Sequence, residues 1–215
     1  MPDEASGEKF ITQVESYFAS QKVGPLLNKG IAGRFSEAVS ALTKSKGLKV
    51  ISGTNNPDGF GVTPTIFVVN WSDVKNHHDL LEEHFGPTSV IIRAPFDQFL
   101  TVAHAMEGQL TAALHAGPGE NVKDLVAKLS QLAGRVIWNG FPTAVSVTAA
   151  QNHGGQWPAS STHTTSVGLD ALYRFVRPVV YQNFPDNQLP AELQNGNPYG
   201  IERVVNGERS NKVIS

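Results

Sequence analysis

The sequence predicts an α/β fold in which helices flank a parallel sheet. Segments with helical periodicity alternate along the chain with short apolar runs that are typical of strands. The run from Thr65 to Asn70 is apolar and β-branched, as expected of a strand covered on both faces. The length of 215 residues suits one large domain, or one domain with an appendage.

Two helices are expected in the N-terminal quarter of the chain, over residues 8–21 and 31–45, and Gly47 is expected to end the second. The side chains expected on their buried faces are Phe10, Val14, Tyr17, Phe18, Phe35, Val39 and Leu42. The next segment, 53–61, is rich in Asn, Gly and Pro and is expected to be a loop.

Three further helices are expected, each with a capping signal. Ser72 would begin a short helix that reaches Leu81, and Asp97 would cap a helix that reaches about Met106. Asn121 would cap a third helix, and Gly134 would lie just past its end. The side chains expected inside this third helix are Leu125, Leu129 and Leu132.

Strands are expected at 49–52, 65–70, 88–93, 109–115 and 135–138. After them, 139–165 is long, rich in Gly, Ser and Thr, and mostly irregular. A brief helix is expected at 170–175, an extended run holding Pro178 at 176–181, and weak strand potential at 201–205. We therefore divide the chain into 1–165, 166–183 and a tail over 184–215.

Charge and composition exclude several classes of function. Seventeen basic residues against 19 acidic ones give a net charge of −2, which offers no attraction to nucleic acid or to an anionic membrane. No apolar run approaches the length of a membrane span, and the first residues lack the features of a signal peptide. The chain has no cysteine, which excludes disulfides and thiolate chemistry in it and fits a reducing cytoplasm.

Metal and hydrolase chemistry are both weakly supported. The seven histidines show no ligand spacing, so we expect no metal site. The hydroxyl cluster at 160–165 surrounds His163, but G-x-S-x-G is absent and such clusters usually bond within their loop. A hydrolase built on His153 or His163 with these hydroxyls is the weaker alternative.

Several short motifs, in order, resemble the aldehyde dehydrogenase superfamily. The motif Glu-Glu-His-Phe-Gly-Pro at 82–87 joins a helix to a strand. Taken alone, it would be interpreted as two solvated acidic residues followed by the end of a helix. Similar matches lie at 106–111, 133–139, 152–155, 164–168 and 171–182. The chain is most similar to the 2,5-dioxovalerate (α-ketoglutaric semialdehyde) dehydrogenases and the related NADP-dependent fatty aldehyde dehydrogenases.

The resemblance implies the C-terminal portion of an aldehyde dehydrogenase catalytic domain. The intact family oxidises an aldehyde to an acid with NADP or NAD, through a cysteine thiohemiacetal and a thioester. Met1 corresponds to a point shortly after that nucleophile, and the general base and the Rossmann-like domain are also missing. We expect this chain alone to be inactive and to bind no cofactor tightly.

By the same resemblance, two residues would contact the cofactor. Glu83 would accept hydrogen bonds from the nicotinamide ribose hydroxyls, and Phe85 would pack near the nicotinamide ring. Phe141, His153 and Trp157 are candidates for the wall of the substrate tunnel. A loop histidine with a local hydrogen bond is the alternative interpretation of His153.

The run Val176 to Tyr181 resembles the family's C-terminal oligomerisation strand. Without its partner hairpin, which would lie in the missing part, this apolar edge should associate with another chain. An aldehyde is the expected substrate of the intact enzyme. The alternative from a different class is a non-catalytic interaction module derived from this domain.

Overall fold

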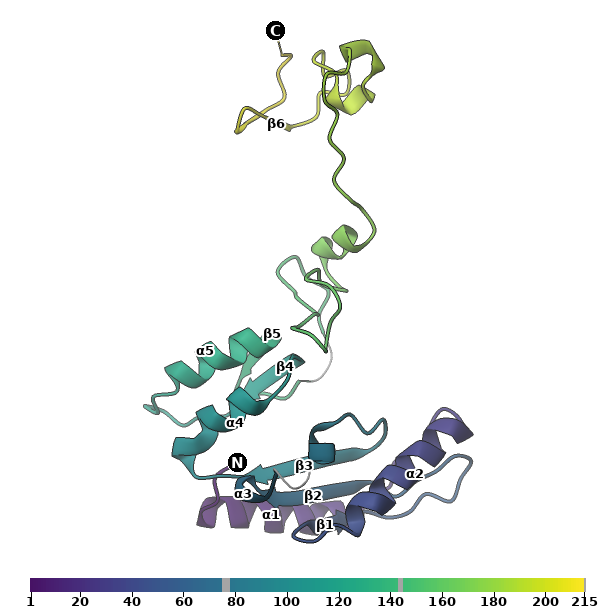
Figure 1. Cartoon of the computed structure of the whole chain (residues 1–215), viewed down its shortest axis with the longest axis vertical. Coiled ribbons are helices and arrows are strands. Elements are labelled where there is room, and N and C mark those ends of the chain that lie inside the picture. The colour runs from purple at the N-terminus through teal and green to yellow at the C-terminus, as the bar shows by residue number, and fades with distance from the viewer. Residues whose placement is uncertain (75–77, 143–144, 215) are drawn as a thin grey trace. The chain divides into compact units, whose positions relative to one another are not determined.

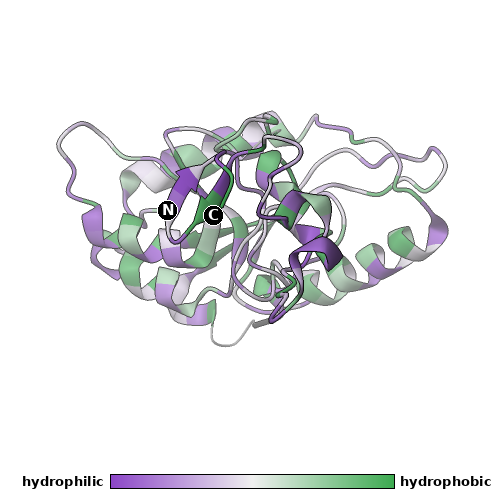
Figure 2. Ribbon diagram, turned by 90° about the horizontal axis from the view of Figure 1, so that it is seen from above, coloured by the Kyte–Doolittle hydropathy of each residue, from purple (hydrophilic) through white to green (hydrophobic). Residues whose placement is uncertain are grey.

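The computed structural model describes residues 1–74, 78–142 and 145–214. Contacts divide the chain into two compact units, Met1–Leu169 and Asp170–Ser215, and each is described by itself. Hydrophobic and hydrophilic residues alternate in bands along the helices (Figure 2), as amphipathic surface helices require. Within the described residues, no helix combines the length and the apolar character that crossing a membrane demands.

A three-stranded sheet lies in the N-terminal part of the first unit (Figure 1). Its strands are β1 (Lys49–Ser52), β2 (Thr65–Asn70) and β3 (Thr88–Arg93), in the order β1-β2-β3. β2 and β3 are parallel, with Thr65 beside Thr88, whereas β1 is antiparallel to β2. The three strands begin and end where the sequence predicted, and the mixed α/β class is confirmed.

Two helices accompany this sheet, α1 (Ala5–Phe18) and α2 (Lys29–Thr43). Asn28 caps α2 by accepting a hydrogen bond from the Ile31 N–H at 2.9 Å. Phe35 and Leu42 are buried as predicted. In α1 the prediction was wrong in part, because Tyr17 is 72% exposed and Ile11, which it omitted, is buried. The helix starts three residues earlier than expected, and its buried face is the stripe Gly7, Ile11, Val14 and Phe18.

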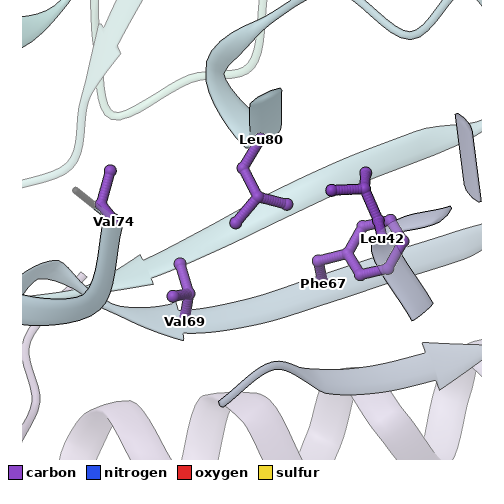
Figure 3. Packing of buried hydrophobic residues seen from close by; sticks show 5 residues of the cluster. All are labelled: Leu42, Phe67, Val69, Val74 and Leu80. Atoms are coloured by element: carbon purple, nitrogen blue, oxygen red, sulfur yellow. The ribbon is translucent and has the colours of Figure 1, made fainter. Parts of the chain in front are cut away.

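The core lies on both faces of β2, because successive side chains of a strand point to opposite faces. On one face Phe67 and Val69 pack with side chains from outside the sheet (Figure 3). Those side chains are Leu42, Val74 and Leu80. On the other face Ile66 and Val68 pack with Ile11 and Ile51. Full burial of one such side chain stabilises the fold by about 1.5–3 kcal/mol.

A second, parallel sheet pairs β4 (Gln109–Leu114) with β5 (Ala133–Trp138). A 3-10 turn (Phe96–Gln98) and α4 (Phe99–Ala105) connect β3 to β4, and α5 (Lys123–Leu132) connects β4 to β5. This alternation is the α/β pattern that the sequence predicted.

The predicted helix caps in this region were wrong. Asp97 lies inside the 3-10 turn and caps nothing, because α4 begins only at Phe99. Val122 occupies the N-cap position of α5, and the Asn121 side chain reaches only the Lys123 N–H, at 3.5 Å. The predicted helix from Ser72 to Leu81 is α3 (Trp71–Val74) and a 3-10 helix (His78–Leu81), with 75–77 and hence His77 outside the described residues.

Beyond β5, the described parts of 139–165 are irregular, as predicted, and a 3-10 helix (Leu169–Arg174) replaces the expected helix. Residues 176–181 are extended and exposed, with no strand partner among the described residues. The second unit contains 3-10 turns at Asp186–Gln188 and Ala191–Leu193 and an antiparallel pair, β6 (Arg203–Val205) and β7 (Glu208–Ser210). β6 lies within the predicted 201–205, whereas β7 was missed.

Candidate functional site

The turn that carries Glu83 and Phe85 joins the 3-10 helix at His78–Leu81 to β3. Its backbone is fixed at two points, because the Thr65 N–H donates to the Pro87 carbonyl at 3.0 Å and the Thr88 N–H to the Gly86 carbonyl at 2.9 Å. Gly86 also lies directly against the ring of Phe35 in α2. The turn is therefore held by β2 and α2 together, which sets its direction independently of its own side chains.

Both candidate cofactor residues project from this fixed turn into solvent. Phe85 is 67% exposed although it is a large aromatic, and Glu83 is exposed beside it. Among the described residues the Glu83 carboxylate has no ion-pair partner and no hydrogen-bond donor. An unpaired carboxylate can accept from two vicinal hydroxyls, and an open aromatic face can cover a planar ring. These residues thus fit a ribosyl nicotinamide.

A glycine-rich loop at 152–157 packs on the first residues of β4 and β5. The Asn152 side-chain N–H donates to the Gly134 carbonyl at 3.0 Å, and Gly155 forms an antiparallel bridge with Ala133. A Cβ on Gly134 would overlap the Gly154 carbonyl, and one on Gly155 would overlap the Gln109 carbonyl. Gly134 lies just past the end of α5, as predicted, and it is also a strand residue of β5 that admits this loop.

His153 lies in this loop with its backbone fully bonded. Its N–H donates to the Thr165 hydroxyl at 2.8 Å, and its carbonyl accepts from both the N–H and the hydroxyl of Ser166 at 3.0 Å. Thr165 is itself buried. The imidazole is half-buried, and its Nδ1 has no hydrogen-bond partner among the described residues. The loop is thus held by its backbone, and the ring makes no local hydrogen bond through Nδ1.

Trp157 lines a cleft of about 500 Å³ together with Asn152, His163 and several hydroxyl side chains. Trp157 itself is 72% exposed. The hydroxyls bond within the loop: Ser160 donates to the Thr162 carbonyl at 2.8 Å, and the Thr162 and Thr164 hydroxyls lie 3.0 Å apart. Over the described part of the chain, His163 makes no hydrogen bond to any of them. This cluster therefore has the geometry of a loop network rather than of an activated nucleophile.

Phe141 lies in a different place from Trp157. Its ring is 76% exposed, and its centroid lies 5.2 Å from that of His115 with the planes tilted by 50°. Phe141 lines a larger, apolar cleft of about 750 Å³ between β3 and β4. The three candidate tunnel residues are therefore spread over this cleft, the cleft that Trp157 lines, and the loop between Asn152 and Gly154.

Sequence reasoning missed two features of this region. In the sequence, the contact between Gly86 and Phe35 is marked by nothing more than a glycine before a strand. The apolar cleft is lined by residues from five elements, so no local motif could reveal it. Within the described ranges, no three His, Cys, Asp or Glu side chains are grouped so that they could hold a metal ion.

Comparison with known proteins gives the same assignment from sequence and from fold. No family model matches the chain. The α-ketoglutaric semialdehyde dehydrogenase of Acinetobacter baylyi is 38% identical over 190 residues, which cover 85% of this chain and 36% of that protein. A second such enzyme, from Azospirillum brasilense, is 35% identical over 206 residues, covering 94% and 39%.

Solved structures with a similar fold are also aldehyde dehydrogenases. The Δ-pyrroline-5-carboxylate dehydrogenase of Mycobacterium tuberculosis, bound with NAD, superposes with a TM-score of 0.63 at 19% identity, over 86% of this chain and 37% of its own. A mutant aldehyde dehydrogenase from Bacillus cereus gives 0.64 at 22% identity, over 79% and 35%. At these identities the match concerns the fold.

Sequence and fold both match part of the chains of aldehyde dehydrogenases. The chain resembles the aldehyde dehydrogenase superfamily in sequence and in fold, as the motifs indicated. It spans a little over a third of the length of the relatives it matches.

Proposed function

We propose that this chain supplies the C-terminal part of the catalytic domain of an aldehyde dehydrogenase that converts α-ketoglutaric semialdehyde to the carboxylic acid. The observation that carries this proposal is the match to two relatives of that name over 85% and 94% of the chain. The net reaction consumes aldehyde, oxidised NADP or NAD and water, and yields acid, reduced cofactor and a proton.

The covalent steps need groups that the chain lacks. A cysteine thiolate adds to the aldehyde carbon to give a thiohemiacetal, and loss of hydride from that carbon leaves a thioester, which activated water hydrolyses. NADP or NAD, when bound, accepts the hydride. Because this chain contains no cysteine, we propose that it is inactive alone.

Glu83 and Phe85 act by positioning. The Glu83 carboxylate accepts hydrogen bonds from the nicotinamide ribose hydroxyls, and Phe85 packs beside the ring. Both protrude from a turn that β2 and α2 hold rigid, so they restrict the ring to few orientations. Two such contacts do not overcome the entropy of association, and we therefore propose that the isolated chain binds no cofactor tightly.

The candidate tunnel residues set the polarity of the substrate path. Phe141 and Trp157 offer exposed aromatic faces in separate clefts, and His153 has a buried ring nitrogen, Nδ1, without a hydrogen-bond partner among the described residues. An imidazole at the tunnel wall suits a polar aldehyde such as one bearing a carboxylate. This is consistent with the substrate in the names of the two relatives.

We further propose that the chain self-associates through Val176 to Tyr181. The segment is extended and its apolar side chains are exposed, with Val180 87% exposed. An extended chain with free backbone groups and apolar side chains pairs readily with a second strand.

Complementation tests this function. The part of the Acinetobacter baylyi relative that precedes its region of similarity to this chain is expressed as a separate polypeptide and mixed with this chain. We expect reduction of NADP or NAD that depends on the aldehyde and on both polypeptides. Titration calorimetry of the isolated chain should show no micromolar cofactor binding. A complex that forms but turns over no aldehyde would favour the non-catalytic module.

A further inference from the structure

A two-residue loop, Asn206-Gly207, joins β6 to β7 in the second unit. Val205 pairs with Glu208, so these two residues alone make the connection. Both have a positive φ, 52° for Asn206 and 90° for Gly207, as a two-residue hairpin loop of type I′ requires. Glycine adopts this conformation readily because it has no Cβ. The geometry of the hairpin therefore favours asparagine followed by glycine at its tip.

Asparagine followed by glycine is also prone to react with water. The glycine nitrogen attacks the side-chain amide carbon of the asparagine, because no Cβ on the glycine hinders the approach. A C–N bond forms, the nitrogen loses its proton, and the side-chain amide leaves as ammonia, which closes a five-membered succinimide ring. Water then opens the ring at one of its two carbonyls. The product is aspartate, or isoaspartate with the main chain running through the side-chain carbon.

The chain contains three such pairs, at 139–140, 195–196 and 206–207, and the structure holds them differently. At the first pair, the Asn139 amide is bound at both of its polar atoms. Its Oδ1 accepts from the Ala116 N–H at 2.9 Å, and its Nδ2 donates to the Ala116 carbonyl at 3.1 Å. Both hydrogen bonds must break before the amide carbon can turn towards the next residue, so this pair is protected.

At the second pair, the backbone rather than the side chain is held. The Asn195 N–H donates to the Asp186 carboxylate at 2.7 Å, and the Asn195 carbonyl accepts from the Ile214 N–H at 3.0 Å. The preceding carbonyl, of Gln194, accepts from the Arg203 guanidinium at 2.6 Å. Ring closure requires rotation of the asparagine backbone, and these contacts oppose that rotation.

At the third pair, neither restraint is present in the part of the chain that the structure describes. The Asn206 side chain is exposed and makes no hydrogen bond there. The tip is held by two strands of three residues each and by an ion pair between Arg209 and Glu202, whose side chains are 78% and 61% exposed. A two-stranded hairpin is marginally stable, and an exposed ion pair adds little, so the tip opens readily.

We propose that Asn206 is a site of spontaneous deamidation by water, and that isoaspartate at this position unpairs β6 from β7. Each event consumes one water, releases one ammonia and adds one negative charge beside Glu208. Isoaspartate lengthens the main chain at the tip, so a two-residue loop no longer brings Val205 opposite Glu208. Aspartate keeps the original chain length and adopts a positive φ as asparagine does. The isoaspartyl product alone therefore opens the hairpin.

Peptide mapping after incubation of the whole chain at mildly alkaline pH tests the site. Trypsin releases Asn206 in the peptide 204–209, separate from the other two pairs. We expect Asn206 to deamidate at least ~10-fold faster than Asn139, whose two hydrogen bonds must first break. Asn195 should fall between them. In urea the three rates should converge, because glycine follows each asparagine. Equal rates in the folded chain, or the same order retained in urea, would overturn the proposal.

Hydrogen exchange at the Val205 and Glu208 amides tests the consequence. The isoaspartyl form, separated from the incubated chain by chromatography, should exchange faster at both amides than the unmodified chain. Asn206→Asp is the matched control, since it adds the same charge without lengthening the main chain, and it should exchange as the unmodified chain does. If the isoaspartyl form and Asn206→Asp exchange alike, the unpairing by isoaspartate is refuted.

Discussion

Gly86 lies so close to the ring of Phe35 that a Cβ on the glycine would overlap the Cδ2, Cε2 and Cγ atoms of that ring. Phe35 is buried within α2, so the glycine anchors the turn before β3 to a helix that is distant in sequence. Glu83 and Phe85 are carried by this turn. Their exposure and direction therefore depend on a packing contact in which neither takes part.

Replacing Gly86 with alanine should destabilise the fold. Overpacking of a buried aromatic costs about 1–3 kcal/mol, because the ring must leave its rotamer or the backbone must shift. The matched control is Gly33→Ala, since Gly33 lies exposed in α2 with nothing within 4 Å of the added carbon. That substitution should stabilise the helix by about 1 kcal/mol. Urea unfolding measures both, and an unchanged midpoint for Gly86→Ala would show that the contact is absent in solution.

Thr165→Val should loosen the loop that carries His153. The Thr165 hydroxyl accepts from the His153 and Val167 N–H groups at 2.8 and 3.2 Å and donates to the Val167 carbonyl at 2.8 Å. Valine has the same shape, so the loss of these bonds at a buried site should cost about 1–3 kcal/mol.

Hydrogen exchange at the His153 amide reports the loosening in Thr165→Val, and it should be faster. Thr101→Val is the control, because Thr101 is exposed on α4 and its hydroxyl makes no hydrogen bond within the described residues. Equal exchange at His153 in the two variants would rule out the role assigned to the Thr165 hydroxyl.

We predict that the stability of the fold depends on pH through the Met1 amino group. Its pKa is lowered from 8.0 in the folded chain by burial, so between the lowered value and 8.0 the unfolded state binds more protons than the folded state. The free energy of unfolding therefore rises with pH across this window and gains nothing more from this group above about 8. Acetylation of the terminus removes the amine but keeps an N–H for the Ile92 carbonyl.

The free and acetylated proteins are compared by urea unfolding over a pH series. The acetylated protein should be more stable at low pH, and the difference should shrink as the pH rises towards 8. Parallel pH profiles for the two forms would mean that the amine is fully hydrated in the folded chain.

Val180→Lys should weaken self-association and leave the fold intact, because the Val180 side chain is 87% exposed. The lysine places a charge on the extended segment Val176 to Tyr181, as natural edge strands do to avoid pairing. Val213→Lys is the control, since Val213 is also exposed in the second unit. Sedimentation velocity over a concentration series gives the result, and a clean monomer of the unmodified chain at high concentration would dismiss the association itself.

The sequence predicted the strands far better than the caps. A run such as Thr65 to Asn70 is buried on both faces, so its composition alone marks its ends. The cap at Asn121 failed because a neighbouring residue, Val122, takes the position, and a shift of one residue is invisible to a capping preference. In α1 the pattern misled because Phe10 and Tyr17 are aromatic yet 49% and 72% exposed.

The sequence predicted the candidate site only where its residues are close together along the chain. Glu83 and Phe85 stand in one motif, and the structure shows them exposed together on a fixed turn. The cleft beside β3 could not be anticipated, since it is assembled from α1, β3, α4, β4 and α5. Gly134 lies past the helix end as predicted, but its need for a small residue comes from the distant Gly154 carbonyl and could not be anticipated.

We propose that Glu83 positions the cofactor in the intact aldehyde dehydrogenase. In the complemented enzyme, kcat/KM for the aldehyde is measured for Glu83→Gln and, as the matched control, for Glu82→Gln. Hydrogen bonds to a charged group contribute about 1.5–3 kcal/mol each, so Glu83→Gln should lower kcat/KM by at least ~10-fold while Glu82→Gln stays within about twofold of the unmodified chain. Equal rates for the two variants would contradict the proposed role of Glu83.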